Sequence, residues 1–319
     1  MRLNFTKCHG SGNDFPLIDA RALTIEEAAW PAIARALADR AGPVGGDGLL
    51  LLTAGTGDAA FGMRMFNSDG SEAETCLNGL RCVARAGFEA LGVDRATVRL
   101  KTSIATVVRA PELAPGVVTI TETAGPATLD VAAWPMRIDT GRLIDAPVPM
   151  LATAQPFTAV AIPNPHLIAF VETVDEAALV GVGAQCEAAP AWLPNRANVS
   201  FVEVRDAATL FVRTFERGVG LTDSCGSAMA ASTYAACLTG RIAFATDITV
   251  RNRGGLVRAR AEDSAMVTLS GNATWEWEGA VTVDPARSRA SDLTIARRHD
   301  EEVAAWAALT GRPEGEQAT

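Results

Sequence analysis

The sequence predicts an α+β protein of two similar domains, each a mostly antiparallel sheet wrapped around a central helix. Most apolar segments are short and alternate with polar residues, which is the pattern of half-buried strands. Each half of the chain also contains one longer run of small and apolar residues, with the length of a buried helix. Many strands and one apolar helix per half predict this arrangement twice over.

Seven short alternating segments are expected to be strands: 3–6, 61–66, 97–101, 117–121, 167–171, 199–204 and 210–215. A first helix is expected from Thr24, with Glu27 completing a capping box and Pro31 bending or ending it early. The two central helices are expected at residues 78–90 and 227–238, each with a glycine near its end.

The expected domain boundary follows a strand, at a Thr-Ala-Gly-Pro turn. The first domain would cover residues 1–124 and the second residues 125–272. A final strand at about 273–283 is expected to return to the first domain. Residues 284–319 would form a C-terminal extension, with an amphipathic helix around 293–309 that we interpret as a surface addition.

Composition excludes several classes of protein. With 319 residues, 48% of them hydrophobic and 20% charged, the chain can form two moderate cores. A net charge of −9 argues against a nucleic-acid surface, which needs clustered positive charge. No apolar stretch of about 18 residues and no signal peptide are recognised, so neither a membrane span nor secretion is expected. Six irregularly spaced cysteines suit a reducing cytoplasm better than a disulfide framework.

Two segments of the chain resemble each other: FNSDGSEAETCLNGLRC, from Phe66, and FERGVGLTDSCGSAMAA, from Phe215. In each, the phenylalanine lies ten residues before a cysteine, Cys76 or Cys225, and a helix-compatible run follows. The N-terminus of a helix lowers the pKa of a thiol and binds an anion such as a carboxylate. Because the pattern recurs 149 residues later, we interpret both cysteines as catalytic. The remaining cysteines are interpreted as buried small hydrophobic residues: Cys8, Cys82, Cys186 and Cys237.

Seven motifs, in order along the chain, resemble those of the diaminopimelate epimerase family. They are KCHGSGNDF, FNSDGSE, CLNGLRC, NPH, NV, ERG and CGS, which begin at Lys7, Phe66, Cys76, Asn164, Asn198, Glu216 and Cys225. Any one of these motifs is a weak signal, but seven in the right order are a strong one. The resemblance covers nearly the whole chain.

This resemblance implies an isomerase that interconverts LL- and meso-diaminopimelate, for lysine and peptidoglycan precursor synthesis. One thiolate would remove the α-proton while the opposite thiol delivers a proton to the other face, with no cofactor and no metal. The active site would lie in the cleft between the two similar domains. The expected partner is a small amino-acid substrate, with no nucleic acid and no membrane, and a homodimer is left open.

The resemblance also implies which residues bind the substrate. The reacting carboxylate would be held by the backbone amides of Leu77, Asn78, Gly226 and Ser227. The distal amino-acid group would be bound by the side chains of Asn13, Asn67, Asn164, Asn198, Glu216 and Arg217. Arg217 would face the distal carboxylate, whose geometry matches a planar guanidinium, and Glu216 the ammonium. His166 and Glu216 are also candidates for tuning the thiols. Each asparagine has an alternative interpretation as a turn or cap residue.

Three positions depart from the family pattern. Leu77 follows the first cysteine where glycine is usual, Leu221 stands in the family's GxGET turn, and Ala228 replaces another glycine. These departures affect the substrate more than the reaction. A cofactor-independent racemase of another amino acid on the same fold therefore stays open.

Other classes of protein fit the residues less well. A cysteine hydrolase could use one thiol with His166, but it would not need the second cysteine turn. A zinc site fails because Cys76 and Cys82 are too far apart for the usual close pair and lack a second pair. The glycine-rich segment from Gly55 is followed by an alternating strand pattern rather than a helix, so it does not predict a dinucleotide site. A non-catalytic binding protein of the same fold would have lost a thiol, and this chain keeps both.

Overall fold

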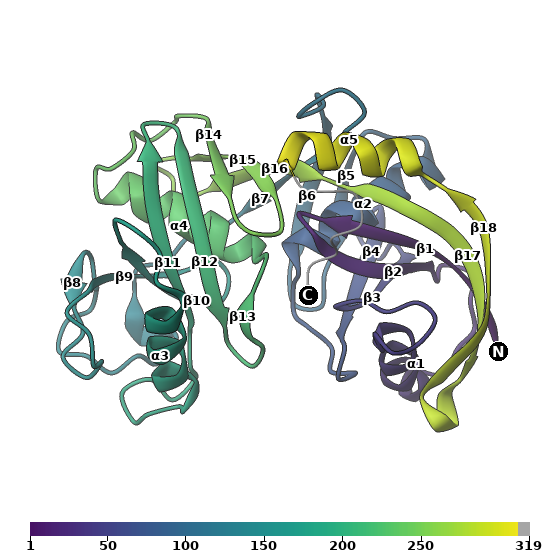
Figure 1. Ribbon diagram of the computed structural model, residues 1–319, viewed down its shortest axis with the longest axis horizontal. Helices are drawn as coiled ribbons and strands as arrows, with labels where there is room; N and C mark the ends of the chain where they lie inside the picture. Colours follow the sequence, from purple (N-terminus) through teal and green to yellow (C-terminus); the bar gives the residue numbers. More distant parts are fainter. Residues whose placement is uncertain (312–319) are drawn as a thin grey trace. The chain divides into compact units, whose positions relative to one another are not determined.

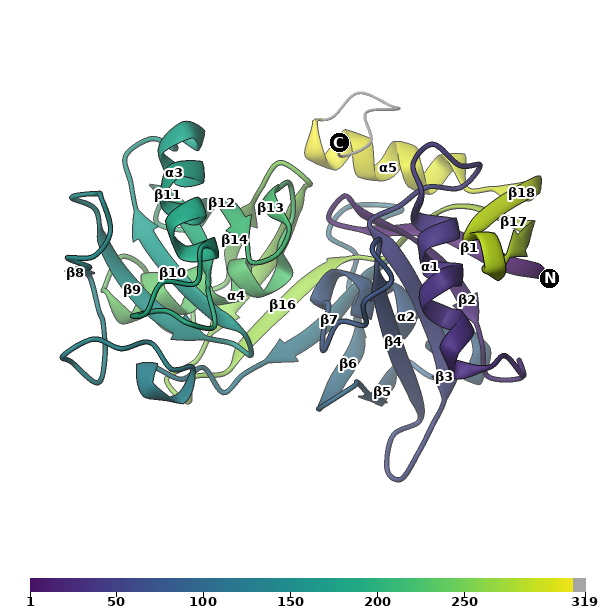
Figure 2. The same cartoon turned by 90° about the horizontal axis from the view of Figure 1, so that it is seen from below.

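The computed structural model describes residues 1–311 of the chain. They divide into two compact units, visible in Figures 1 and 2. Among the described residues, unit 1 comprises residues 1–122 and 270–311, and unit 2 comprises residues 123–269. None of the helices in residues 1–311 is long and apolar enough to cross a membrane.

Unit 1 is a mostly antiparallel sheet around helix α2 (Leu77–Leu91), which lies against β1 to β6. The strands lie in the order β18-β17-β1-β2-β3-β4-β5-β6-β7; the β2–β3 and β4–β5 pairs are parallel and the other pairs antiparallel. Their bounds are β1 (Arg2–Gly10), β2 (Asn13–Asp19), β3 (Gly48–Ala54), β4 (Phe61–Asn67), β5 (Arg95–Arg99), β6 (Ile104–Ala110), β7 (Thr119–Ala124), β17 (Thr274–Asp284) and β18 (Arg289–Arg298). The other helices are η1 (Glu27–Ala29), α1 (Trp30–Ala38), η3 (Pro285–Arg287) and α5 (Asp300–Thr310).

Unit 2 repeats this plan around helix α4 (Gly226–Leu238), which lies against β9 to β12 and β15. Its strands pair as β8-β9-β10-β11-β12-β14-β15, with β13 also on β12; β10–β11 and β12–β14 are parallel. Their bounds are β8 (Ala146–Pro147), β9 (Pro156–Ala161), β10 (Pro165–Phe170), β11 (Asn198–Asp206), β12 (Thr209–Glu216), β13 (Gly220–Thr222), β14 (Ile248–Arg251) and β15 (Leu256–Ala261). The remaining elements are η2 (Val131–Ala133) and α3 (Glu176–Glu187), while β16 (Val267–Asn272) begins in unit 2 and ends in unit 1.

The parallel pairs show that the units are copies of one plan. A parallel pair needs a crossover connection, and a helix supplies it in each of the four cases. Helices α1 and α2 follow β2 and β4 in unit 1, while α3 and α4 follow β10 and β12 in unit 2. The predicted α+β fold, with a sheet around a central helix twice over, is therefore confirmed.

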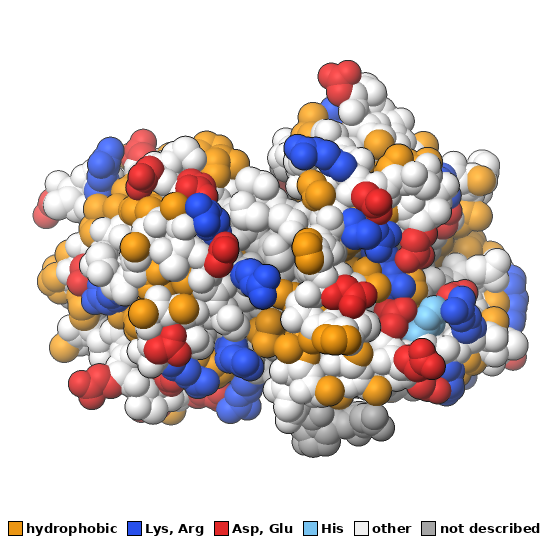
Figure 3. Space-filling view, turned by 90° about the horizontal axis from the view of Figure 1, so that it is seen from above, with side chains coloured by type: hydrophobic (Ala, Val, Ile, Leu, Met, Phe, Trp, Pro, Cys, Tyr) orange, Lys and Arg blue, Asp and Glu red, His pale blue; other side chains and the backbone are white. Residues whose placement is uncertain are grey.

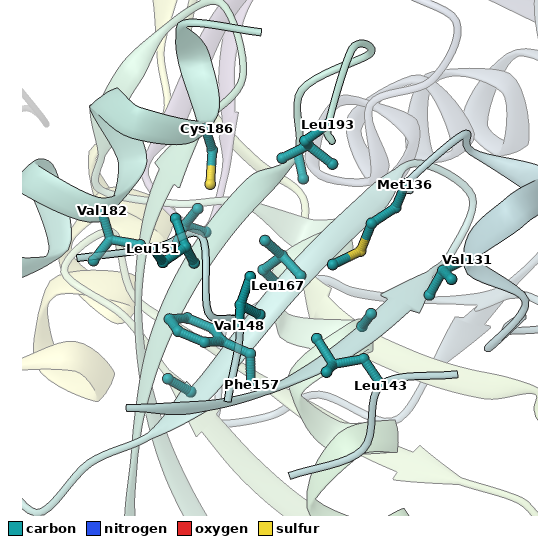
Figure 4. Close-up of a cluster of buried hydrophobic side chains, with 14 of the residues drawn as sticks. Val131, Met136, Leu143, Val148, Leu151, Phe157, Leu167, Val182, Cys186 and Leu193 are labelled. Atoms are coloured by element: carbon teal, nitrogen blue, oxygen red, sulfur yellow. The ribbon is translucent and has the colours of Figure 1, made fainter. Parts of the chain in front are cut away.

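Each unit has its own hydrophobic core. In unit 1, the buried face of α1, including Ile33 and Leu37, packs with strand residues such as Leu49 and Val281. In unit 2, α3 and the loops before β9 pack against strand residues in a second cluster, and Figure 4 shows side chains such as Phe157 and Leu167 from it. The central helices are buried almost all round, which agrees with their runs of small and apolar residues.

The C-terminal segment differs from the expectation. Residues 289–298 form strand β18 on the edge of β17, and a helix begins at Asp300, so the helix expected at 293–309 is wrong in its first half. Helix α5 packs on β17, and its Trp306 is buried against the ring of His9, with 5.8 Å between ring centroids. Glu302 also binds the Arg85 guanidinium with two oxygens, at 2.5 and 2.9 Å.

The first helix is also displaced from its expected start. Thr24 lies outside regular structure, and α1 begins at Trp30, after the short turn η1. Pro31 therefore lies in the first turn of α1 instead of ending a helix. A proline is well tolerated there, because the N–H it lacks would have no partner within the helix.

Candidate active site

Cys76 is the N-cap residue of α2. Its backbone is extended, with φ −149° and ψ 103°, and its sulfur accepts a hydrogen bond from the Gly79 N–H at 3.4 Å. Glycine at position 79 allows the helix to pack closely here, since a Cβ would lie 2.6 Å from the end of the Leu50 side chain on β3, which would have to move. The close packing of the helix on the sheet thus holds an amide N–H against the half-buried thiol, where it stabilises negative charge.

Two of the predicted substrate-binding asparagines surround this thiol. The Cys76 Sγ lies 3.8 Å from the Oδ1 of Asn13, which follows the turn between β1 and β2. The same oxygen accepts from Nδ2 of Asn78 at 3.5 Å. The structure therefore brings Asn13 next to Cys76 and Asn78, which lie 63 and 65 residues further along the chain.

Asn67 is not part of this cluster. It ends β4, and its Nδ2 donates to the Ser71 hydroxyl at 2.9 Å while its backbone N–H donates to the Ser71 carbonyl at 2.8 Å. Gly70, at φ +87°, allows this tight turn. The Asn67 amide thus stabilises the turn that leads toward Cys76, and its assignment to the substrate stays a proposal.

Asp47 is a neighbour of this cluster that the sequence analysis missed. Its carboxylate accepts a hydrogen bond from the Asn13 Nδ2 and binds Arg40 at 2.7 Å. The signal that could have drawn attention to it is a lone acidic residue among the glycines of GGDG, from Gly45. Burial and the neighbouring Asp14 raise the pKa of the Asp47 carboxyl, against the hydrogen bond from Asn13.

Cys225 occupies the corresponding position at the start of α4. It is also an extended N-cap residue, with φ −128° and ψ 108°, and its sulfur lies 3.5 Å from the Ser227 hydroxyl. Only 8% of Cys225 is exposed. Burial, followed by the charge of Glu216, raises the pKa of the Cys225 thiol well above its usual range, while the Ser227 hydroxyl and the Ala228 N–H act in the opposite direction.

Glu216 is held at the end of β12 by the hairpin that the ERG motif begins. The Thr222 hydroxyl, on β13, donates to Glu216 Oε1 at 2.5 Å. Thr222 stands at the threonine of the family's GxGET pattern, and this hydrogen bond joins it to the Glu216 carboxylate. The charge of Glu216 raises the pKa of the Cys225 thiol, and the thiol-tuning role of Glu216 stays a prediction.

His166 joins a second cluster of predicted residues in unit 2. Its Nε2 lies 3.2 Å from Asn164 Oδ1 and 3.5 Å from Asn198 Nδ2, and the Asn198 Oδ1 accepts from the Arg217 backbone N–H at 2.9 Å. The Arg217 guanidinium donates to the Asn195 carbonyl at 3.1 Å. Burial and, second, the charge of Arg217 lower the pKa of His166 to about 3. His166 is therefore neutral at ordinary pH and can supply a hydrogen bond but no positive charge.

The four expected backbone donors lie in the first turns of the two helices. Leu77 and Asn78 open α2, and Gly226 and Ser227 open α4. First-turn N–H groups point along the helix axis toward its N-terminal end, where an anion binds well. Leu77 is buried, with 7% of the residue exposed. The four other cysteines are buried, as expected.

Solved structures share this fold. A hydroxyproline epimerase from Agrobacterium vitis matches 97% of this chain and 97% of its own, with a TM-score of 0.62 and 12% identity. A phenazine biosynthesis protein of the PhzF family from Bacillus anthracis matches 89% of this chain and 100% of its own, with a TM-score of 0.63 and 16% identity. At this level of identity the likeness concerns the fold alone.

Comparison of sequences is more specific. The family model for diaminopimelate epimerase matches residues 5–109 and 158–276. A diaminopimelate epimerase from Clostridium acetobutylicum is 39% identical over 291 residues, which cover 89% of this chain and 87% of the relative. One from Enterococcus faecalis is 40% identical over 285 residues, covering 86% of this chain and 87% of the relative. The resemblance seen in the motifs is thereby confirmed, and the chain belongs to the diaminopimelate epimerase family.

Proposed function

We propose that this protein interconverts LL- and meso-diaminopimelate, in the synthesis of lysine and peptidoglycan precursors, by proton transfer at the α-carbon. The observation that carries this proposal is the equivalent placement of Cys76 and Cys225, each at the N-cap of the central helix of its unit. Two thiols in equivalent positions fit a reaction that needs a base on one face of a carbon and an acid on the other. The membership of the family supports the substrate.

In the proposed reaction, one sulfur takes the α-proton as a thiolate and becomes a thiol. The electron pair left on carbon spreads into the carboxylate, which takes on enediolate character. The opposite thiol then delivers its proton to the other face and becomes the thiolate. The product has the inverted configuration, and the enzyme is left in the opposite protonation state, ready for the reverse reaction.

The two thiols have different surroundings, so we propose that they differ in protonation state in the resting enzyme. Burial and Glu216 favour the protonated form of Cys225. Cys76 is only half-buried and has a donor for its thiolate in the Gly79 N–H as well as an acceptor for its thiol in Asn13, so its thiolate is less disfavoured than that of Cys225. We therefore propose that Cys225 is the acid in the first half-reaction of the resting enzyme and that Cys76 is the base. The first-turn amides of Leu77, Asn78, Gly226 and Ser227 are proposed to hold the reacting carboxylate.

The distal amino-acid group is proposed to bind Asn13, Asn67, Asn164, Asn198, Glu216 and Arg217. The contact of Asn198 with the Arg217 backbone, and of Asn164 with His166, supports a common cluster in unit 2. Neutral His166 is proposed to act there through hydrogen bonds. In unit 1, the Asn67 amide bonds within its own turn, and its place in this set rests on the family motif.

The partner and the compartment follow from the same chemistry. The substrate is a small amino acid, and the reaction is proposed to need no cofactor, nucleic acid or membrane. We place the protein in the cytoplasm because both thiols must stay reduced. On the face shown in Figure 3, acidic and basic side chains are interspersed. Whether the protein acts as a homodimer is tested by sedimentation equilibrium of the purified protein.

The substrate is tested by incubating the purified protein in D₂O with a panel of amino acids and following loss of the α-proton by NMR. Exchange into LL- and meso-diaminopimelate, without added cofactor, is the expected result. Exchange into another amino acid but not diaminopimelate would replace the substrate and keep the mechanism, an outcome that Leu77 and Leu221 keep open.

The two-base mechanism is tested by replacing each thiol. Cys76→Ala and Cys225→Ala are each expected to lower epimerisation by several orders of magnitude, because one face of the carbon then lacks its acid or base. Cys82→Ala, in the same helix as Cys76, is the control and is expected to keep the reaction. Substantial epimerisation by either single variant would contradict the proposal.

A further inference from the structure

A chain of side-chain hydrogen bonds with a single direction runs past Cys76. It begins at Arg81, which is fully buried and forms an ion pair of 2.7 Å with the equally buried Glu122. Arg81 Nη2 donates to Asn78 Oδ1 at 2.8 Å, and Asn78 Nδ2 donates to Asn13 Oδ1 at 3.5 Å. The chain ends where Asn13 Nδ2 donates to the Asp47 carboxylate.

The charged groups at the two ends of this hydrogen-bond chain fix the orientation of the two asparagine amides. A guanidinium can only donate, so the atom of Asn78 that faces Arg81 must be its oxygen. A carboxylate can only accept, so the atom of Asn13 that faces Asp47 must be its nitrogen. Both constraints turn the Asn13 carbonyl oxygen toward the Cys76 sulfur, which lies 3.8 Å away.

Asp47 is itself well held. Its Oδ2 also accepts from the Asp14 backbone N–H at 3.1 Å, and its Oδ1 binds Arg40 at 2.7 Å. Arg40 reaches Asp14 as well, at 2.7 Å, and Asp14 forms a buried ion pair with Lys7. The Asp14 N–H on β2 and the Arg40 guanidinium in the loop after α1 thus hold the Asp47 carboxylate, while Lys7 and Arg40 compensate the negative charge of the neighbouring Asp14.

We propose that Asp47 is a positioning residue that holds the Asn13 carbonyl oxygen against the Cys76 sulfur, where it accepts the S–H proton. The sulfur then has an acceptor for its thiol form in Asn13 and a donor for its thiolate form in the Gly79 N–H. A thiol that must carry a proton in one half of a catalytic cycle and lose it in the other needs both. The inference deepens the proposed function, on which it rests for the catalytic role of Cys76.

The test measures the pH midpoint of iodoacetamide alkylation at Cys76, followed by peptide mass spectrometry on the whole protein. Asp47→Ala frees the Asn13 amide, so that water or the amide N–H reaches the sulfur and favours the thiolate. The midpoint is expected to fall by about one pH unit. Asp47→Asn keeps an oxygen that accepts from Asn13 and is expected to restore most of the shift. Asp19→Ala, which removes an exposed carboxylate from the same strand as Asn13, is expected to leave the midpoint unchanged.

A double-mutant cycle shows whether Asp47 acts through Asn13. Asn13→Ala should also lower the midpoint, and the Asn13→Ala/Asp47→Ala double variant should lower it no further. An unchanged midpoint in Asp47→Ala, or additive shifts in the double variant, would overturn the inference. If Asp47→Ala does not fold, Asp47→Ser provides the same comparison, since its hydroxyl is too short to reach Asn13.

The two proposals fail in different ways. If the variants shift the alkylation midpoint as expected but the protein does not exchange the α-proton of diaminopimelate, the proposed function is wrong and the positioning role of Asp47 stands. If the protein epimerises diaminopimelate but Asp47→Ala leaves the midpoint unchanged, the positioning role is wrong and the proposed function stands.

Discussion

Cys76 and Cys225 show how one residue type in one structural position acquires two chemical characters. Both are extended N-cap residues of a central helix. Cys76 is half-buried between the Asn13 oxygen and the Gly79 N–H, whereas Cys225 is buried beside a carboxylate. The helix N-terminus is therefore common to both thiols, and the side chains around each one set its proton affinity.

The carboxylate beside Cys225 is expected to be measurable in its alkylation. Glu216→Gln removes the negative charge that, after burial, raises the pKa of this thiol. The pH midpoint of Cys225 alkylation should therefore fall, by about one unit. Glu262→Gln, an exposed carboxylate of the same unit, is the control and should leave the midpoint in place. An equal or higher midpoint in Glu216→Gln would show that Glu216 does not face the thiol in solution.

The motifs in the sequence identified the candidate catalytic cysteines, but not the residues that position groups around them. The two cysteines were predicted because their context repeats along the chain. Asp47 and Arg81 were not, because an aspartate between glycines is typical of a surface turn and an arginine in a helix is typical of its exposed face. Asp47 contacts Asn13, 34 residues away, and Arg81 contacts Glu122, 41 residues away; only the folded sheet brings the members of each pair together.

At the scale of elements, the central helices were predicted nearly to their ends and α3 was not. The runs after Cys76 and Cys225 are rich in small and apolar residues, and the structure places them at α2 and α4. Helix α3 contains two glycines, Gly181 and Gly183, which argue locally against a helix. The structure explains Gly183, since a Cβ there would lie 2.3 Å from the Phe215 ring. A tertiary contact thus overrides the local preference.

The two glycines of α3 provide a matched pair for testing this explanation. Gly183→Ala is expected to lower the free energy of unfolding by about 1–3 kcal/mol, because the new methyl group overpacks against Phe215. Gly181→Ala, with nothing within 4 Å of its Cβ position, is expected to raise it by about 0.5–1 kcal/mol. Urea unfolding of both variants measures the difference. Equal stabilisation by the two substitutions would contradict the packing explanation.

At the scale of the whole molecule, the chain is two copies of one plan with an addition to the first. The repeat of the cysteine segment predicted two similar domains, and the matching parallel pairs confirm them. The sequence predicted this extension and the second half of its helix, but not strand β18, because β18 and α5 are held by contacts with residues far away in the sequence. Glu302, for example, binds Arg85, 217 residues away, and β18 completes the edge beside β17. A short segment with mixed polarity is equally compatible with a strand or a helix until such partners are known.

The buried ion pair of unit 1 makes the stability of the molecule depend on pH. Glu122 is fully buried, its Oε1 binds Arg81 at 2.7 Å, and its Oε2 has no hydrogen-bond partner among the described residues. Burial raises the pKa of Glu122 from its ordinary 4.5 to about 7, against the charge and hydrogen bond of Arg81. Between these two pH values the folded protein holds a proton that the unfolded chain has lost. The contribution of Glu122 to stability is therefore present below pH 4.5 and is lost as the pH rises toward 7.

Glu122→Gln isolates this contribution, because glutamine keeps the shape of the protonated side chain and does not titrate. The difference in free energy of unfolding, wild type minus variant, is expected to fall by on the order of 3 kcal/mol as the pH rises from about 4.5 to about 7, and then to level off. Urea unfolding of both proteins at a series of pH values measures it. A difference that instead grows with pH would mean that the attraction of Arg81 outweighs the desolvation of the carboxylate. Glu122 would then be ionised throughout, and the pair would stabilise unit 1 as two charges.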